Sequence, residues 1–152
     1  LPIFAPIIKK WWKLRYTLIP YIIAQSRKAI SSGAPLLQAL IFHHPEDKLC
    51  WHIDDEYYFG NDFLVAPVMN SENRRDVYLP EGQWVNFFTG EVLEGGRWLK
   101  DLDVPLDEMP VYVRQGATIP VYPDEVECTD EMDLSKSAEL HIDNHFKGIF
   151  KD

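Results

Sequence analysis

The apolar residues of the first third of the chain recur every three or four positions, which is the period of an amphipathic helix. We therefore predict a helix over residues 6–32. Pro20 lies inside this pattern and predicts a kink or a break near Leu18, because proline lacks the N–H that a helix interior needs. Gly33 predicts the C-terminal end of this helix. The apolar face consists of Ile7, Trp11, Leu14, Leu18 and Ile22.

A short apolar run, residues 36–42, follows between Pro35 and the corner His43-His44-Pro45. A strand that follows a helix and is apolar on both sides is typical of a parallel strand that is buried on both faces. A single helix–strand unit cannot close a sheet or cover both sides of its strand. We therefore expect the neighbouring strands in sequence upstream of this chain.

From residue 57 onward, short β-like runs alternate with turn residues. Evenly spaced short strands of this kind favour an antiparallel sandwich or barrel. The predicted fold class is therefore mixed, and mainly β after residue 56. An acidic stretch at 124–133 precedes a last strand-like run at 138–142. The other predicted strands are 57–59, 63–69, 76–79, 83–88, 97–102, 111–114 and 117–122.

Composition and charge narrow the classes of partner. The chain has 152 residues, 46% hydrophobic and 26% charged, as is usual for a globular domain. Residues 1–48 carry seven basic and two acidic side chains, whereas residues 49–152 carry eight and twenty-two. The acidic body argues against a nucleic-acid partner, because it repels phosphate. No apolar run approaches the roughly 20 residues of a spanning helix, which argues against a membrane protein.

The two cysteines, Cys50 and Cys128, form neither a disulfide framework nor a CxxC pair. They fit a reducing compartment and favour the cytoplasm, although a single bridge between them stays an alternative. The chain begins within an apolar pattern, with no initiator Met and no signal peptide, as expected of a fragment.

The densest group of reactive side chains is residues 43–56, with three histidines, one cysteine and five carboxylates. Zinc needs three or four converging ligands, usually at spacings such as HExxH or paired CxxC. Neither spacing occurs here. We therefore predict no metal and no other cofactor, and interpret the segment as a polar loop held by Trp51 and Ile53.

The carboxylates of the same segment are candidates for acid–base chemistry. A retaining glycosidase needs two carboxyl groups roughly 5–5.5 Å apart. Neighbouring residues of an extended segment point to opposite faces, so Asp54 and Asp55 would not converge. Turn capping or pairing with arginine is the favoured role. The chain also lacks a GxSxG motif and a glycine-rich phosphate loop. We therefore predict no catalytic residue.

Aromatic side chains make up 13% of the chain. Exposed rings on a β-sandwich stack on sugars in carbohydrate-binding modules, but most such rings lie in the core. We favour the core for Trp84, Phe87, Phe88 and Trp98, and no substrate-binding residue is assigned.

Five segments, in the same order, resemble glycoside hydrolase family 31, the family of α-glucosidases and α-xylosidases. They are similar to the family's LRYxLxPY helix, its GxPVMRPLFLEFPxD strand and loop, its IDxxFxxGxxLLVAPV block, its VYLPxGxW turn and its PVFVRxGxIIP hairpin. In this sequence they are residues 13–21, 33–47, 53–68, 76–84 and 109–120.

The resemblance has two departures and one consequence. Gln38-Ala39 stand where the family commonly has Arg-Pro, and His43-His44 replace an acidic–aromatic pair. The family's nucleophilic aspartate, its acid/base aspartate and its sugar-gripping His–Asp pair lie on earlier barrel strands. No segment here matches those motifs, so no catalytic residue is carried over.

The resemblance implies that the chain is a fragment of a retaining α-glycosidase. Residues 1–48 would be the last helix and strand of a (β/α)8 TIM barrel, residues 49–122 the proximal C-terminal β-sandwich, and residues 123–152 a linker and the start of a further β segment. The chain would act as a structural brace and be inactive alone. Its partners would be the missing N-terminal part of the enzyme and an α-linked oligosaccharide.

The alternative is a free-standing, non-catalytic carbohydrate-binding β-sandwich module. The exposure of residues 7–42 distinguishes the two hypotheses. A bare apolar helix face would indicate missing barrel strands and would promote self-association, whereas a self-contained module would cover it.

Overall fold

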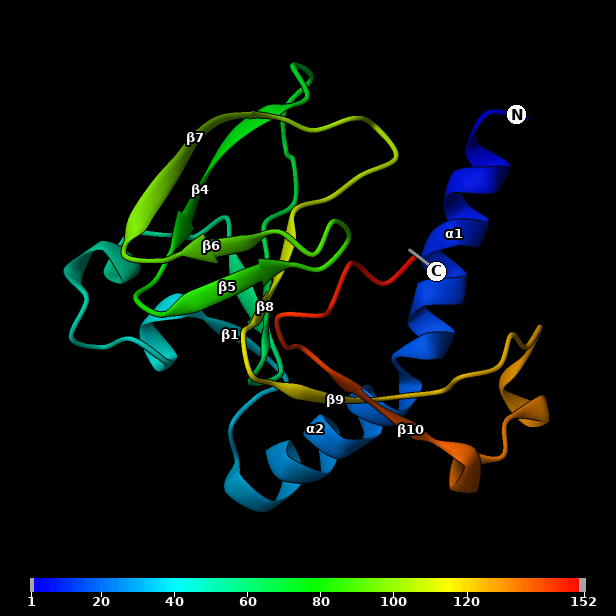
Figure 1. The fold of residues 1–152 in the computed structure, drawn as a ribbon. Helices are drawn as coiled ribbons and strands as arrows, with labels where there is room; N and C mark the ends of the chain where they lie inside the picture. The colour runs from blue at the N-terminus through cyan, green and yellow to red at the C-terminus, as the bar shows by residue number, and fades with distance from the viewer. Residues whose placement is uncertain (1, 151–152) are drawn as a thin grey trace. The chain divides into compact units, whose positions relative to one another are not determined.

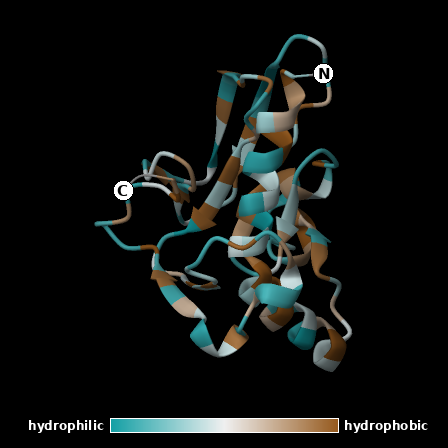
Figure 2. Cartoon of the chain, turned by 90° about the vertical axis from the view of Figure 1, so that its right-hand side faces the viewer, coloured by the Kyte–Doolittle hydropathy of each residue, from teal (hydrophilic) through white to brown (hydrophobic). Residues whose placement is uncertain are grey.

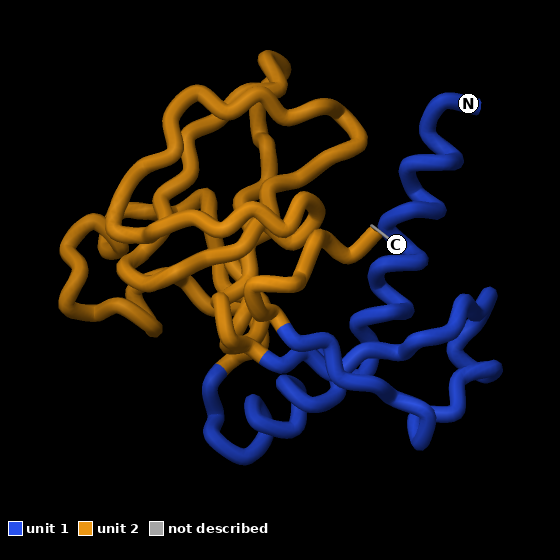
Figure 3. Tube along the Cα trace, in the orientation of Figure 1, with its two compact units in different colours: residues 1–34, 118–141 blue, residues 35–117, 142–152 orange. Residues whose placement is uncertain are grey.

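The computed structural model describes residues 2–150 and divides the chain into two compact units (Figure 1, Figure 3). Unit 1 comprises residues 1–34 and 118–141, and unit 2 comprises residues 35–117 and 142–152. Each unit therefore combines two stretches that are far apart in the sequence. Among the described residues, no helix is long and apolar enough to cross a membrane.

Unit 1 begins with two helices, α1 (Phe4–Thr17) and α2 (Ile19–Ser32). Leu18 separates them with φ −90° and ψ 0°. Pro20 lies in the first turn of α2, where its missing N–H costs no hydrogen bond. The helix ends at Gly33, whose φ of 76° lies in the left-handed region that favours glycine. The predicted break near Leu18 and the predicted end at Gly33 are both confirmed.

The second stretch of unit 1 forms an antiparallel pair of strands, β9 (Thr118–Val121) and β10 (Ala138–His141). Two short 3-10 turns lie between them, within residues 129–136. Directly after β9, the Tyr122 N–H donates to the Thr17 carbonyl at 2.8 Å. This hydrogen bond joins the end of α1 to the strand pair.

The apolar surface of α1 is covered only in part. Leu14 and Leu18 are buried, as the helical period predicts, while the other three members of the predicted face are half-buried. A second row, Phe4, Ile8 and Trp12, is exposed at spacings of four residues. Apolar and polar segments alternate along the helices in Figure 2. Unit 1 therefore carries apolar helix surface that its own residues leave uncovered.

Unit 2 contains two antiparallel sheets (Figure 1). One sheet has the strand order β1-β2-β3-β8-β5-β6, and the other pairs β4 with β7. The antiparallel organisation predicted after residue 56 is thus confirmed. The strands are β1 (Leu37–Ala39), β2 (Tyr57–Phe59), β3 (Phe63–Val65), β4 (Arg74–Leu79), β5 (Gln83–Asn86), β6 (Val92–Glu94), β7 (Arg97–Asp103) and β8 (Val111–Arg114).

The core of unit 2 takes side chains from both sheets. Tyr58, Leu64 and Trp84 come from the first sheet, and Val77 and Leu79 come from β4. Burying one side chain of this kind contributes roughly 1.5–3 kcal/mol. The shared core makes unit 2 a sandwich-like β structure that closes on its own residues.

The structure corrects the prediction for residues 36–42. The strand β1 is only three residues long, pairs antiparallel with β2 and exposes Leu37 and Ala39. The rest of the run, Leu40–Phe42, is a 3-10 turn. The prediction of a parallel strand buried on both faces is therefore wrong, because the run forms an edge strand and a turn. The strand β1 lies in unit 2, which begins at residue 35. The domain boundary at residue 49 stays a prediction.

Other features were not predicted. The strand β6 has no strong sequence pattern, and β9, assigned to the segment 49–122, pairs with β10 in unit 1. Residues 142–150 return to unit 2, where the Ile149 N–H donates to the Phe87 carbonyl at 2.9 Å. The two cysteines are both free, one buried and the other exposed, so the alternative of a bridge between them is not realised.

Candidate functional site

The reactive side chains of residues 43–56 do not gather at one point. Among residues 2–150, no group of three or more His, Cys, Asp or Glu side chains is arranged to hold a metal ion. His43 and His44 lie against the ring of Tyr58, whereas His52 is exposed. The expectation of no bound zinc stays a prediction, which elemental analysis of the purified chain tests.

Hydrogen bonds to Asp47 instead organise this segment as a loop. The Asp47 carboxylate accepts from the Leu49 N–H at 3.0 Å and from the Tyr78 hydroxyl at 2.6 Å. Burial opposes its ionisation, but these hydrogen bonds outweigh burial and lower the pKa of Asp47. The Trp51 indole N–H donates to the Pro45 carbonyl at 2.9 Å. The structure therefore fits the sequence interpretation of a polar loop fastened by Trp51.

A cluster of ring and cationic side chains surrounds Tyr58. The His44 Nε2 atom lies 2.6 Å from the Tyr58 hydroxyl, and Arg114 Nη2 donates to the same hydroxyl at 3.2 Å. The His43 ring stacks on the Tyr58 ring with centroids 4.0 Å apart. The Arg114 guanidinium also lies over the rings of Tyr58 and Trp84, at 5.3 and 5.4 Å. The cluster ties the corner after β1 to β2, β5 and β8.

Both histidines of this cluster are held in their neutral form. Burial and then the Arg114 charge lower the pKa of His43 to about 4, and the same two causes lower the pKa of His44. The His43 Nε2 atom is buried without a hydrogen-bond partner. At neutral pH the cluster is therefore a packing and hydrogen-bonding element and supplies no charged imidazolium for proton donation.

The carboxylates of Asp55 and Glu56 meet at Arg75. Arg75 Nη2 lies 3.1 Å from Asp55 Oδ2 and 3.6 Å from Glu56 Oε1, whereas Asp54 is exposed. Arg75 Nη2 makes no hydrogen bond, so these contacts are electrostatic. Glu56 Oε1 accepts the Tyr78 N–H at 2.7 Å. The Arg75 guanidinium lies close to both carboxylates, which agrees with the arginine pairing favoured by the sequence over a catalytic pair.

The Glu56 side chain is completely buried. Burial raises its pKa to about 7, against the lowering effects of a backbone hydrogen bond and the Arg75 charge. Arg75 also donates to the carbonyl oxygens of Asp55, Pro67 and Asp76. The pair therefore fixes β4 to the two neighbouring segments and includes a carboxyl group that titrates near neutral pH.

The aromatic residues of the β-strands divide between core and surface. Trp84 is 1% exposed and Phe87 is fully buried, so the core prediction is confirmed for these two residues. Phe88 is half-buried. The Trp98 ring is exposed and carries the Lys100 ammonium 4.9 Å from its centroid. The core prediction is therefore wrong for Trp98, because its strand β7 turns this position toward solvent.

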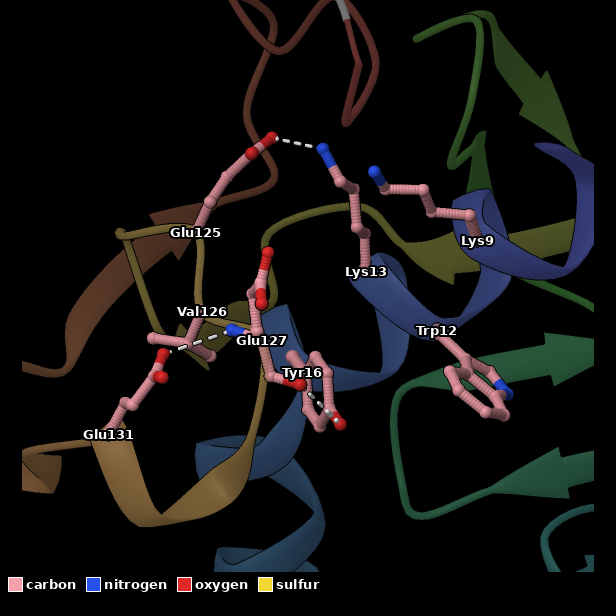
Figure 4. Close-up of a pocket in the computed structure, with 8 residues that line it drawn as sticks. All are labelled: Lys9, Trp12, Lys13, Tyr16, Glu125, Val126, Glu127 and Glu131. Carbon is pink, nitrogen blue, oxygen red and sulfur yellow. Dashed lines mark hydrogen bonds and ion pairs between the residues drawn. The ribbon is translucent and has the colours of Figure 1, made fainter.

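Unit 1 contains a pocket of about 480 Å³ (Figure 4). Lys13 Nζ lies 2.8 Å from Glu125 Oε1, and the Tyr16 hydroxyl donates to the Glu127 carbonyl at 3.3 Å. The Glu127 N–H donates to Glu131 Oε2 at 3.1 Å. The lining residues are Lys9, Trp12, Lys13 and Tyr16 from α1 and Glu125, Val126, Glu127 and Glu131 from the segment after β9.

Sequence reasoning missed this pocket. The sequence shows an acidic stretch at 124–133 and a basic N-terminal third, but no local pattern links the two. The signal lay in combining the two, because a basic helix face and an acidic segment attract one another. The spacing of Lys9, Trp12, Lys13 and Tyr16 also places them on one side of α1.

Comparison with known proteins identifies the family. The family model described as the glycosyl hydrolase family 31 C-terminal domain matches residues 33–119. That range is more than half of the chain and contains every strand of unit 2. The chain belongs to glycoside hydrolase family 31. The segment 33–47, which we expected to close the barrel, falls within the family's C-terminal domain, in agreement with the antiparallel pairing of β1.

Longer relatives support the same assignment. Alpha-glucosidase 2 of Bacillus thermoamyloliquefaciens is 34% identical over 149 residues, covering 97% of this chain and 18% of that protein. An alpha-xylosidase of Saccharolobus solfataricus is 36% identical over 130 residues, covering 84% of this chain and 18% of the relative. The chain thus spans less than a fifth of the length of these relatives.

Solved structures show the same fold. A family 31 dextranase of Flavobacterium johnsoniae, complexed with isomaltotriose, superimposes with a TM-score of 0.78 at 35% identity, over 83% of this chain and 16% of that one. An α-xylosidase of Xanthomonas citri gives a TM-score of 0.72 at 35% identity, over 78% and 13% of the two chains. The glycosidase context of the chain is therefore established by sequence and by fold.

Proposed function

We propose that the chain is the C-terminal part of a retaining α-glycosidase that hydrolyses α-glucosides or α-xylosides. The observation that carries the proposal is the match of residues 33–119 to the family's C-terminal domain, in a chain that spans 18% of its α-glucosidase relative. In such an enzyme one carboxylate attacks the anomeric carbon and a second protonates the leaving oxygen. The buried carboxylate of Glu56 lies beside Arg75, and the proposal assigns both catalytic groups to the N-terminal part.

The role proposed for this chain is that of a structural brace. The assignment of residues 1–48 to the end of the barrel stays a prediction, although β1 within this range pairs with β2 in unit 2. The exposed side chains of Phe4 and Ile8 support a contact with the missing N-terminal part. The assignments of residues 49–122 to a proximal β domain and of residues 123–152 to a linker and further β segment stay predictions.

Hydrolysis assays test the proposal. Aryl α-glucosides and aryl α-xylosides are offered to the purified chain alone and to the chain co-expressed with the upstream portion of its gene. We expect no turnover by the chain alone and turnover by the co-expressed pair. Turnover by the chain alone that disappears in the Asp54→Asn or Asp55→Asn variant would contradict the proposal, and so would an upstream reading frame without the family's catalytic aspartate motifs.

The second candidate function is a free-standing carbohydrate-binding module. The observation in its favour is the exposure of two large rings, Trp12 at 64% and Trp51 at 61%. Such a module would bind sugars without any upstream partner, and co-expression would yield no turnover. The same hydrolysis assay, combined with a sugar titration, therefore separates the two candidates.

A further inference from the structure

We propose that the pocket of unit 1 binds a neutral α-linked oligosaccharide, with the ring of Trp12 as its stacking surface. The inference deepens the proposed function and rests on it, because it takes carbohydrate to be the ligand class of the protein. All eight lining residues belong to unit 1, so the pocket is defined within one compact unit.

The ring of Trp12 gives the pocket its apolar surface. Trp12 is 64% exposed although it is the largest side-chain type. Trp12 lines the pocket from α1, as Lys9 and Lys13 do, and the segment after β9 supplies the acidic side chains (Figure 4). An indole face offers a broad, rigid apolar plane beside polar groups. The C–H face of a pyranose ring is complementary to such a plane.

The polar lining offers both acceptors and donors. Glu131 uses Oε2 for the Glu127 N–H, which leaves its second carboxylate oxygen as an acceptor. Lys13 spends one of its three ammonium donors on Glu125 and retains the others. Each sugar hydroxyl is itself a donor and an acceptor, so a pair of neighbouring hydroxyls matches adjacent ammonium and carboxylate groups.

The charges and the internal hydrogen bonds select this ligand class over others. Three glutamates against two lysines disfavour phosphate and other anions, and the charged lining disfavours a purely apolar ligand. The bonds Lys13–Glu125, Tyr16–Glu127 and Glu127–Glu131 hold the lining in place before a ligand arrives, which reduces the ordering cost of binding. The volume of about 480 Å³ falls within the range of small-molecule sites, roughly 300–1,000 Å³.

Titration calorimetry of the whole chain with isomaltotriose and with maltotriose tests the inference. We expect saturable binding to at least one of them by the unmodified chain. The Trp12→Ala variant should bind about tenfold more weakly, or about 1.4 kcal/mol, and Trp12→Phe should lie between the two because it retains a smaller ring. Trp51→Ala, which removes a ring of similar exposure from unit 2, is the matched control and should bind as the unmodified chain does.

The outcomes decide the case. Circular dichroism and thermal unfolding confirm that each variant is folded, as expected for the removal of exposed rings. No binding of either sugar by the folded chain overturns the inference, and so does equal weakening by Trp12→Ala and Trp51→Ala. If neither sugar binds the chain but the co-expressed pair hydrolyses the aryl glycosides, only the inference about the pocket is rejected. Binding at Trp12 without turnover by that pair rejects only the proposed enzyme role.

Discussion

The two units of this chain use their large apolar side chains in different ways. In unit 2, Trp84 is 1% exposed and Tyr58 is fully buried, within a core shared by two sheets. In unit 1, Trp12 is 64% exposed and lies in a row with two other bare apolar residues on α1. Unit 2 buries large rings in a core of its own, although Trp51 and Trp98 are exposed, whereas unit 1 leaves a row of apolar side chains exposed along one helix. The difference indicates that unit 1 is the part built to contact something else.

The backbone of the two units shows the same contrast. The larger sheet of unit 2 has six strands, each bonded to its neighbours. The described residues of unit 1 form one strand pair and two 14-residue helices. An isolated two-stranded ribbon is marginally stable in water, and an isolated helix shorter than about 12–15 residues is too. Unit 1 therefore depends more on tertiary contacts than unit 2 does.

The largest expected effect is a difference in amide hydrogen exchange. Amides at 63–65, 83–86 and 111–114 should exchange only through global unfolding, whose free energy is roughly 5–15 kcal/mol. Amides of β9 and β10 in unit 1, and of the edge strand β1 in unit 2, should exchange through local openings of lower free energy, orders of magnitude faster. Exchange followed by mass spectrometry at the peptide level measures this. Equal protection of both regions in a monomeric chain would remove the contrast and refute the fragment hypothesis.

The next effect compares two tryptophans. Trp84→Ala should lower the free energy of unfolding by about 3–5 kcal/mol, because it leaves a cavity in the core of unit 2. Trp12→Ala should change it by no more than about 0.5 kcal/mol, because the ring is mostly exposed. Urea denaturation of both variants provides the comparison. Similar losses in the two variants would mean that the ring of Trp12 is covered in solution.

The pH dependence of stability sharpens the description of unit 2. Glu56 has its pKa raised from 4.5 to about 7 in the folded state. Between these values the folded chain holds a proton that the unfolded chain releases. The contribution of Glu56 to stability is therefore fully present below pH 4.5 and is lost as pH rises through 7. At about 1.4 kcal/mol per pKa unit, the loss amounts to about 3 kcal/mol.

The Glu56→Gln variant is the matched control for this effect. It keeps an acceptor for the Tyr78 N–H and removes the titrating group. The lowered pKa of His43 acts in the opposite direction, with stability present above pH 6.5 and lost toward pH 4, and it operates in both proteins. The difference between the two unfolding curves from pH 4.5 to 7 therefore isolates Glu56. A constant difference across that window would mean that Glu56 is ionised in the folded chain.

Local signals in the sequence predicted much of this structure. Pro20 and Gly33 marked the helix break and the helix end because each restricts its own backbone, and alternation marked β2 and β8 without error. The pairing of β1 was mispredicted because it depends on the partner that returns after residues 43–56. The same holds for the pocket of unit 1, whose two sides lie more than a hundred positions apart in the sequence. Long-range contacts of this kind have no local pattern to reveal them.

The smallest effect concerns the hydroxyl of Tyr58. Tyr58→Phe keeps the ring that His43 stacks on and removes only the oxygen, which contacts His44 Nε2 at 2.6 Å and Arg114 Nη2 at 3.2 Å. We expect the free energy of unfolding to fall by about 1 kcal/mol, which is the usual net contribution of a hydrogen bond.

Tyr57→Phe is the matched control for Tyr58→Phe, because its ring lies next in the same strand and is half-buried. Urea denaturation at pH 7 should leave this variant within about 0.5 kcal/mol of the unmodified chain. Equal unfolding midpoints for the two variants would show that the Tyr58 hydroxyl adds nothing beyond ring packing. The stability of unit 2 would then rest on its apolar core alone. The two units would differ only in how much apolar surface they bury, and this polar cluster would play no part in the difference.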